Sequence, residues 1–341
     1  MKNNIQIRRE NGETIYAEAP IIISASRSTD IPAFYADWFL YRLKVGYSVW
    51  INPFNGIKSF VAFDKARLIV FWSKNPSQLL KKGGCLDYLE EKGINCYVQY
   101  TLNDYVKEKL EQGVPSLQER IDTFKRLVDK LGYGRVVWRF DPMILTRQIT
   151  TDDILEKVRY IGNQLKGYTE KLVFSYADIS SYWKVQANLE RSAIKYKEFN
   201  DDEMYYIAEN LVAMNSDWGY TLATCAEKID LMRYGISHNK CIDDDLMIKY
   251  FSKDKLLMDF LGIEVGQGDL FNPKGTIVIR KKSNKDRGQR KWCGCIKSKD
   301  IGEYNTCPHM CEYCYANSSK ETAIRNWQQH NTNPKAETIK G

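Results

Sequence analysis

Short apolar runs alternate with amphipathic segments along most of the chain. Seven runs are rich in β-branched and aromatic residues and end at turn-forming or charged residues, as buried parallel strands do; they cover residues 21–24, 47–51, 67–72, 96–101, 135–140, 172–175 and 220–224. Between and after these runs, apolar residues recur at helical spacing. We therefore expect helices over residues 32–45, 117–131, 151–165, 201–214, 244–261 and 318–329.

Repeated alternation of strand and helix predicts an α/β fold with a parallel sheet. Seven such units within about 220 residues fit a (β/α) barrel, complete or partial, and a doubly wound open sheet is the alternative. Residues 276–279 are one candidate for an eighth strand. The composition changes after Gly275, so we expect a barrel-like domain over residues 1–275. Residues 276–341 would then form a basic linker and a cysteine-cluster module that packs on the barrel mouth.

The composition indicates a folded protein of the cytoplasm. Of the 341 residues, 43% are hydrophobic and 13% aromatic, enough for a sizeable core. The sequence has no apolar run of the ~20 residues that a membrane span needs, and its first residues lack the apolar core of a signal peptide. In a reducing cytoplasm, the nine cysteines favour metal or redox ligands over a disulfide framework.

Positive charge is concentrated in one segment. The chain has a net charge of +7, and residues Arg280–Lys291 carry seven basic residues against Asp286 alone. Such a run favours contact with nucleic acid. It is also typical of a solvated linker, and a third interpretation is that these cations stabilise an anionic metal cluster nearby.

Three cysteines near the C-terminus form the strongest chemical signal. Cys307, Cys311 and Cys314 have the spacing C-x3-C-x2-C, and thiolates are soft ligands for zinc, copper(I) or iron–sulfur clusters. Four cysteines fill the iron corners of a ferredoxin-type [4Fe–4S] cluster, so three would leave one iron open. Zinc usually requires further cysteine pairs or histidines, and none of the three histidines in the chain lies at a zinc-finger spacing.

Cys293 and Cys295 lie twelve residues before this motif as a C-x-C pair. They are possible additional metal ligands, redox-active thiols or packing residues. Four of these five cysteines could also form a closed structural zinc or iron site. The other four cysteines are isolated in the sequence and are expected to be mainly buried small apolar residues; they are Cys85, Cys96, Cys225 and Cys241.

Polar residues follow the predicted strands, where barrel enzymes carry their functional groups. We select six of them as candidate ligands for a cofactor or substrate: Arg27, Asp30, Lys74, Arg139, Asp141 and Glu227. Arg139 interrupts an apolar run, and a buried charge there needs a partner. Asp141, Asp178 or Glu227 could serve, as could an anionic ligand. The sequence has no Walker A, G-x-G-x-x-G, H-E-x-x-H or G-x-S-x-G motif, which argues against the corresponding enzyme classes.

With Tyr313 as its aromatic residue, the cysteine motif resembles that of the radical S-adenosylmethionine (SAM) superfamily. This resemblance implies a [4Fe–4S] cluster whose open iron is chelated by the amino and carboxylate groups of SAM. Reductive cleavage of SAM then gives a 5′-deoxyadenosyl radical. In that superfamily the motif follows the first strand of the barrel, whereas here it comes last.

From about residue 20 to residue 330, the whole chain resembles the DUF1848 family of bacterial proteins. The resemblance is carried by residues 24–32 (SASRSTDIP), 70–76 (VFWSKNP), 138–142 (WRFDP), 224–227 (TCAE) and 293–314.

These observations support three hypotheses. The first is an iron–sulfur enzyme that activates SAM, with an electron donor as partner and a small-molecule or macromolecular substrate; Arg27 and Lys74 would bind the carboxylate of SAM. The second is a metal-stabilised protein, with zinc or a closed iron–sulfur cluster, that binds nucleic acid through Arg280–Lys291. The third is an electron-transfer or redox-sensing protein that has the cluster but does not use SAM.

Overall fold

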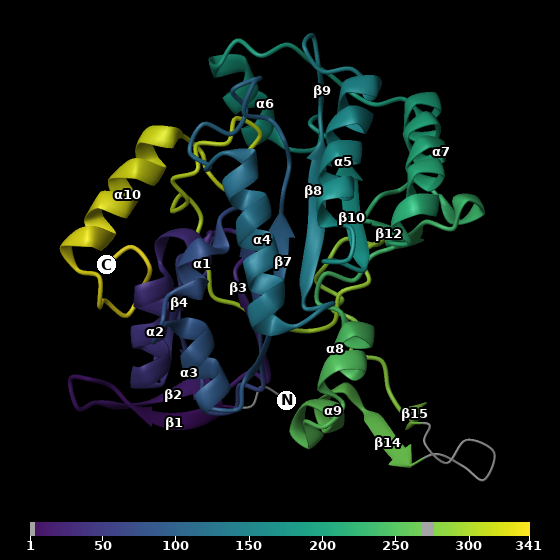
Figure 1. Ribbon diagram of the computed structural model, residues 1–341. Helices are drawn as coiled ribbons and strands as arrows, with labels where there is room; N and C mark the ends of the chain where they lie inside the picture. Colours follow the sequence, from purple (N-terminus) through teal and green to yellow (C-terminus); the bar gives the residue numbers. More distant parts are fainter. Residues whose placement is uncertain (1–3, 268–275) are drawn as a thin grey trace.

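A sheet of eight parallel strands forms the centre of the computed structural model, which describes residues 4–267 and 276–341 (Figure 1). The strand order is β13-β12-β10-β8-β7-β6-β3-β16, and every pair is parallel. The strands are β3 (Ile22–Ala25), β6 (Leu68–Ser73), β7 (Asn95–Thr101), β8 (Val136–Met143), β10 (Lys171–Tyr176), β12 (Thr221–Thr224), β13 (Ser237–His238) and β16 (Lys299–Asp300). This confirms the α/β class and the parallel sheet.

The expected strand at residues 47–51 lies in a different sheet, so its assignment to the parallel sheet was wrong. It is β4 (Tyr47–Ile51) and pairs antiparallel with β5 (Lys58–Ala62). Asn52 N donates to Ile57 O at 3.0 Å and closes the hairpin between them. An apolar run does not encode its partner strand, and here a short turn provides an antiparallel one. With β1 (Asn4–Arg8) and β2 (Thr14–Glu18), these strands form a four-stranded sheet.

The candidate eighth strand at residues 276–279 is also placed outside the parallel sheet. It belongs to β15 (Thr276–Arg280), which pairs antiparallel with β14 (Ile263–Gln267). The edges of the parallel sheet are instead formed by β13 and β16. Each of these has two residues, too few to produce a recognisable pattern. A further short pair joins β9 (Leu145–Thr146) and β11 (Tyr196–Lys197).

The long helices begin where the sequence provides caps. A capping box, in which side chain and backbone exchange hydrogen bonds, starts α4 (Leu117–Leu131), α5 (Thr151–Leu165) and α7 (Asp201–Trp218). Two expected helices are each divided in two: the first into α1 (Ile31–Phe34) and α2 (Ala36–Val45), the second into α8 (Asp244–Phe251) and α9 (Lys255–Leu261). The other helices are η1 (Pro76–Leu80), α3 (Cys85–Glu91), α6 (Trp183–Arg191), η2 (Met232–Tyr234) and α10 (Lys320–Thr332).

The two faces of the sheet have different coverings. On one face, strand residues such as Phe71 and Trp138 pack with apolar residues of α2, α4, α5 and α7; α4 and α5 lie in front of the sheet in Figure 1. On the other face, Val70 and Val173 belong to a second core with residues of α8 and α9 and with Cys241, Cys293 and Cys295. One face is therefore covered by the connecting helices, and the other by the later part of the chain.

The C-terminal segment returns to the first helices. The rings of Phe34 and Trp327 lie 6.2 Å apart, and those of Tyr35 and His330 lie 4.7 Å apart. Trp38 Nε1 donates to Ala336 O at 2.8 Å. Helix α10 is therefore held against α1 and α2, which fixes the loop that leads into it (Figure 1).

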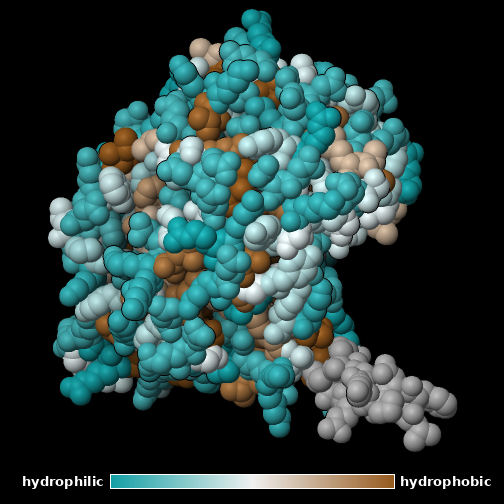
Figure 2. All heavy atoms as spheres, viewed as in Figure 1, coloured by the Kyte–Doolittle hydropathy of each residue, from teal (hydrophilic) through white to brown (hydrophobic). Residues whose placement is uncertain are grey.

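None of the helices within residues 4–267 and 276–341 combines the length and the apolar composition needed to cross a membrane. The face of the molecule in Figure 2 is mainly hydrophilic, and hydrophobic residues are scattered over it rather than gathered in one patch.

Candidate functional site

The loop that carries Cys307, Cys311 and Cys314 lies over the carboxyl ends of three neighbouring strands. His309 contacts Asp30, which follows β3, through an Nε2–Oδ2 distance of 2.7 Å. The Tyr313 hydroxyl lies 2.9 Å from Lys74 Nζ, after β6, and 3.1 Å from Asn103 Nδ2, after β7. The cysteine motif therefore lies at the edge of the sheet where α/β proteins place their ligands.

A neighbouring loop aligns the cysteine loop from the side. Glu111 and Cys311 form an isolated antiparallel bridge, and Glu312 N donates to Leu110 O at 2.9 Å. Gly113 N donates to His309 O at 2.8 Å, and a Cβ atom on Gly113 would lie 2.7 Å from that oxygen. The two backbones approach so closely that only glycine fits at this position.

The three thiols share one environment. Burial raises the pKa of each thiol. Cys314 lies close enough to raise the pKa of Cys307 and Cys311 further, and Cys307 does the same to Cys311. Other groups lower the pKa of each thiol. Backbone N–H groups of His309 and Asp30 do so for Cys307, and those of Asn317 and Ala316 do so for Cys314. For Cys311 the lowering group is the Lys74 ammonium. Every sulfur therefore faces at least one donor or cation that would stabilise a thiolate.

Lys74 belongs to a buried network beside Cys311. Its Nζ lies 2.7 Å from Glu111 Oε1, which also accepts from the Tyr313 hydroxyl. Arg120 Nη1 lies 3.5 Å from the other Glu111 oxygen. Burial tends to raise the pKa of Glu111, but Lys74 and Arg120 outweigh it and hold that pKa at about 2. The network keeps a cation beside the motif, although sequence reasoning had assigned Lys74 to a ligand.

Asp30 has a structural role in this site. One carboxylate oxygen accepts from Ala33 N and from Ser73 Oγ; the other accepts from Lys74 N and contacts His309. The second ring nitrogen of His309 contacts Gly113 O at 3.1 Å. Asp30 therefore joins the ends of β3 and β6 to the cysteine loop, and both ring nitrogens of His309 face protein oxygens.

Arg139 pairs with Asp141, one of the three carboxylates considered as its partner. Its Nη2 pairs with Asp141, whose other oxygen accepts from Ser175, and its Nη1 lies 3.2 Å from Gln99 Oε1. The guanidinium groups of Arg139 and Arg27 lie 5.3 and 5.2 Å from the Trp72 ring, so two cations flank one indole. In the described part of the chain, Arg27 Nη2 and Trp72 Nε1 are buried and have no hydrogen-bond partner.

Glu227 has an unusual acidity for a carboxyl group. Burial, with the nearby Asp141 and Cys225, raises its pKa to about 8, although Tyr176 N donates to its Oε1 at 3.0 Å. At neutral pH the group is therefore mostly protonated and can donate a hydrogen bond.

Of the six candidate ligands, Asp30 and Lys74 lie at the cysteine motif, whereas Arg27, Arg139, Asp141 and Glu227 gather around Trp72 and Cys225.

A second group of cysteines lies next to these residues. Cys225 Sγ is 3.6 Å from Cys241 Sγ, and Cys241 N donates to Cys295 Sγ at 3.2 Å. A hydrogen bond with Cys295 lowers the pKa of Cys293 to about 7. The sequence pointed to Cys293 and Cys295 as possible ligands. It predicted Cys225 and Cys241 to be mainly buried apolar residues, because nothing in the sequence links these two to a C-x-C pair 52 or more residues away. The position of Cys225 directly after β12 was the one available signal, and Cys241 had none, because the two-residue strand β13 before it leaves no recognisable pattern.

The basic segment Arg280–Lys291 is partly neutralised. Arg280 pairs with Asp244 and Asp245, and Lys281 pairs with Glu264 at 2.5 Å. Lys291 lies over the Trp292 ring at 4.6 Å. Part of this charge therefore serves the protein's own folding.

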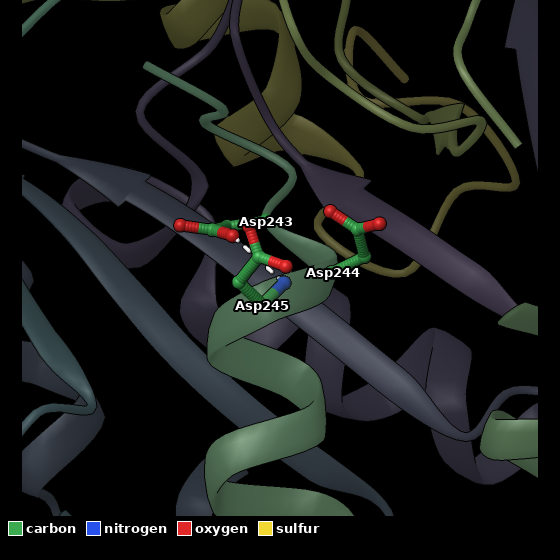
Figure 3. Close-up of side chains that lie close together, drawn as sticks. All are labelled: Asp243, Asp244 and Asp245. Atoms are coloured by element: carbon green, nitrogen blue, oxygen red, sulfur yellow. Dashed lines mark hydrogen bonds between the residues drawn. The ribbon is translucent and has the colours of Figure 1, made fainter. Parts of the chain in front are cut away.

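Three consecutive aspartates form the tightest group of potential metal ligands. Among residues 4–267 and 276–341, Asp243, Asp244 and Asp245 are the one trio of His, Cys, Asp or Glu with ligand atoms all within 4.8 Å (Figure 3). Each already has a cation: Asp243 pairs with Lys171 at 2.8 Å, and the other two pair with Lys240 at 2.7 Å. Asp243 also caps α8. Ion pairing and capping account for this group.

The fold and the site define an α/β protein with two groups of cysteines at the carboxyl ends of a parallel sheet. The chain belongs to the family described as "Domain of unknown function (DUF1848)", whose sequence model matches residues 22–316. No curated protein and no solved structure shows significant similarity to the chain.

Proposed function

We propose that this protein is an iron–sulfur enzyme of the radical SAM type. Cys307, Cys311 and Cys314 would hold a [4Fe–4S] cluster with one open iron, at which SAM would bind. The observation that carries the proposal is the position of these three thiols in one loop over the carboxyl ends of β3, β6 and β7, each facing an N–H donor or a cation.

The spacing of the three thiols is compatible with a cluster. Cys314 is close enough to raise the pKa of Cys307 and Cys311, yet the three sulfurs do not all lie within 4.8 Å of one another. Ligands of one ion must lie closer together than thiolates bound to three different irons. Because burial raises the pKa of all three thiols, cluster binding would release their protons. The Lys74 ammonium and the backbone N–H groups would then balance the cluster's negative charge.

The residues around Trp72 would bind SAM or the substrate. Arg27 Nη2 and Trp72 Nε1 are buried donors without a protein partner in the described residues, so a carboxylate or another polar acceptor is the ligand that would satisfy them. Protonated Glu227 adds a hydrogen-bond donor. The Asp141 carboxylate, which accepts a hydrogen bond from the Ser175 hydroxyl, adds an acceptor. We assign the carboxylate of SAM to Arg27 rather than to Lys74, whose ammonium is held by Glu111 and Tyr313.

We further propose that the sheet is a partial (β/α) barrel. The connecting helices cover one face, and buried polar side chains of Ser24, Gln99 and Arg139 lie on the other. In a (β/α) barrel, helices cover the outside of the sheet and polar side chains gather at the carboxyl end of the interior, so this distribution is the one that a barrel would have. When bound, the cluster would supply one-electron chemistry to SAM, while the protein would supply position, hydrogen bonds and exclusion of water.

Anaerobic reconstitution with iron and sulfide, followed by dithionite and SAM, tests the proposal. We expect formation of 5′-deoxyadenosine by the wild-type protein and none above background by Cys311→Ala. Cys96→Ser is the matched control, because Cys96 is buried away from both cysteine groups and contacts Arg135. Equal amounts of 5′-deoxyadenosine from wild type and Cys311→Ala would refute the proposal.

A further inference from the structure

We propose that Cys225, Cys241, Cys293 and Cys295 form a second metal site, which binds one tetrahedral ion of the zinc class. This proposal does not depend on the SAM chemistry, because the two sets of cysteines share no residue.

The fold brings these four cysteines together from three segments. Cys225 directly follows β12, Cys241 follows β13, and Cys293-Gly-Cys295 precedes β16. Gly294 N donates to Asn239 O at 3.3 Å, and a Cβ atom on Gly294 would lie 2.8 Å from Lys240 Cγ. The C-x-C pair therefore lies directly against the loop that carries Cys241, and its central glycine permits this close approach.

One pair of these sulfurs has the spacing of two ligands of a single ion. Zinc–sulfur bonds of about 2.3 Å in a tetrahedron place thiolates about 3.8 Å apart, and Cys225 Sγ lies 3.6 Å from Cys241 Sγ. Sulfurs on different irons of a cubane lie farther apart. The four thiols form a chain of neighbours in the order 225, 241, 295, 293, not yet a closed tetrahedron. A change of rotamer at the two outer cysteines would complete it.

Hydrogen-bond donors converge on the two central sulfurs. Cys241 Sγ accepts from Arg139 Nη1 at 3.1 Å and from Asn239 Nδ2 at 3.2 Å. Cys295 Sγ accepts from the backbone N–H groups of Cys241 and Ile242 at 3.2 and 3.4 Å. Four N–H donors on two sulfurs stabilise thiolates, as donors around metal-bound cysteines do. The Arg139 guanidinium would balance part of the net charge of −2 that four thiolates give to a divalent ion.

The site would tie the last part of the sheet to the segment that leads to the first cysteine motif. Closed four-cysteine sites are structural and contribute to folding. We therefore propose that this ion has a structural role. It would hold residues 293–295 against the ends of β12 and β13 and would thereby also fix the residues around Trp72.

Metal analysis of the full-length protein tests the assignment. We expect about one zinc per chain in wild type and in Cys311→Ala, and loss of that zinc in Cys241→Ser and in Cys295→Ser. Cys96→Ser should retain it. A second iron–sulfur cluster lost in Cys241→Ser, or zinc retained in both serine variants, would overturn the proposal.

Cobalt substitution decides the question even if the serine variants do not fold. Cys311→Ala protein stripped of metal by a chelator and titrated with Co²⁺ should show the intense thiolate-to-cobalt bands of a tetrahedral site at one equivalent. Their absence, or a Cys225–Cys241 disulfide found by mass spectrometry of the protein isolated without oxygen, would contradict it. These readouts require no SAM, so their failure is distinguishable from a failure to form 5′-deoxyadenosine.

Discussion

Lys74 and Glu111 form a buried ion pair, with Nζ 2.7 Å from Oε1, directly beside the Cys311 thiol. Glu111 is fully buried and keeps its charge because Lys74 and Arg120 both face it. Lys74 links three parts of the chain: the end of β6, the loop after β7 and the cysteine loop. The pair therefore connects the fold of the sheet to the electrostatics of the proposed cluster.

Replacing Lys74 with methionine should destabilise the protein strongly. The change leaves the Glu111 carboxylate buried with Arg120 as its remaining nearby cation, and breaking a buried pair in this way costs about 3–5 kcal/mol. Urea unfolding measures the loss. Lys81→Met is the control: Lys81 pairs with Asp37 at an exposed site, so its loss should cost less than about 1 kcal/mol. Equal effects of the two changes would show that the Lys74 pair is not important.

Glu111 should also make stability depend on acid pH. Its pKa is about 2 in the folded protein against an ordinary 4.5, so its contribution is present above pH 4.5 and is lost as pH falls towards 2. We expect the stability difference between wild type and Glu111→Gln to be largest above pH 5 and to shrink by about 3 kcal/mol by pH 2. Unfolding at a series of pH values gives this difference, and a constant difference would contradict the ion-pair assignment.

Glu227 should have the opposite pH dependence. Its folded pKa of about 8 lies above the ordinary 4.5, so the folded state favours the protonated form. Its contribution is full below pH 4.5 and is lost as pH rises through 8. Glu227→Gln imitates the protonated group, and we expect it to be more stable than wild type by about 1–3 kcal/mol at pH 9. The gain should disappear near pH 5, and a gain that is unchanged there would argue against the raised pKa.

Gly113→Ala should distort the cysteine loop, because the new methyl group would meet the His309 and Pro308 carbonyl oxygens at 2.7 and 2.8 Å. We expect a loss of about 1–3 kcal/mol in stability and faster loss of iron from the reconstituted protein. Gly288→Ala is the control, since its Cβ would approach only the Asp286 side chain, at 3.3 Å. Identical iron retention in the two variants would show that the contact does not shape the motif.

Sequence patterns predicted the parallel sheet because apolar strands buried on both faces leave a strong local signal. Six of seven expected strands are in that sheet. The seventh, Tyr47–Ile51, is equally apolar but pairs with its hairpin neighbour, and pairing is a property of the whole fold. The edge strands β13 and β16 have two residues each, so they form only because the neighbouring strands provide hydrogen-bond partners.

The site was only partly predictable for the same reason. Cys307, Cys311 and Cys314 are recognisable because their spacing lies within one loop. Cys225 and Cys241 approach Cys293 and Cys295 only after β12, β13 and β16 are in place. The partner of Arg139 was among the expected carboxylates, since Asp141 is two residues away on β8. The role of Glu111 was not anticipated, because its loop contains no motif and its partners come from distant segments.

Electron paramagnetic resonance of the reduced, reconstituted protein tests the central claim most directly. A cluster on Cys307, Cys311 and Cys314 with an open iron should give a reduced [4Fe–4S] signal that changes when SAM is added, and Cys311→Ala should lack it. A signal that SAM leaves unchanged, or iron content and signal that persist in Cys311→Ala, would contradict the account.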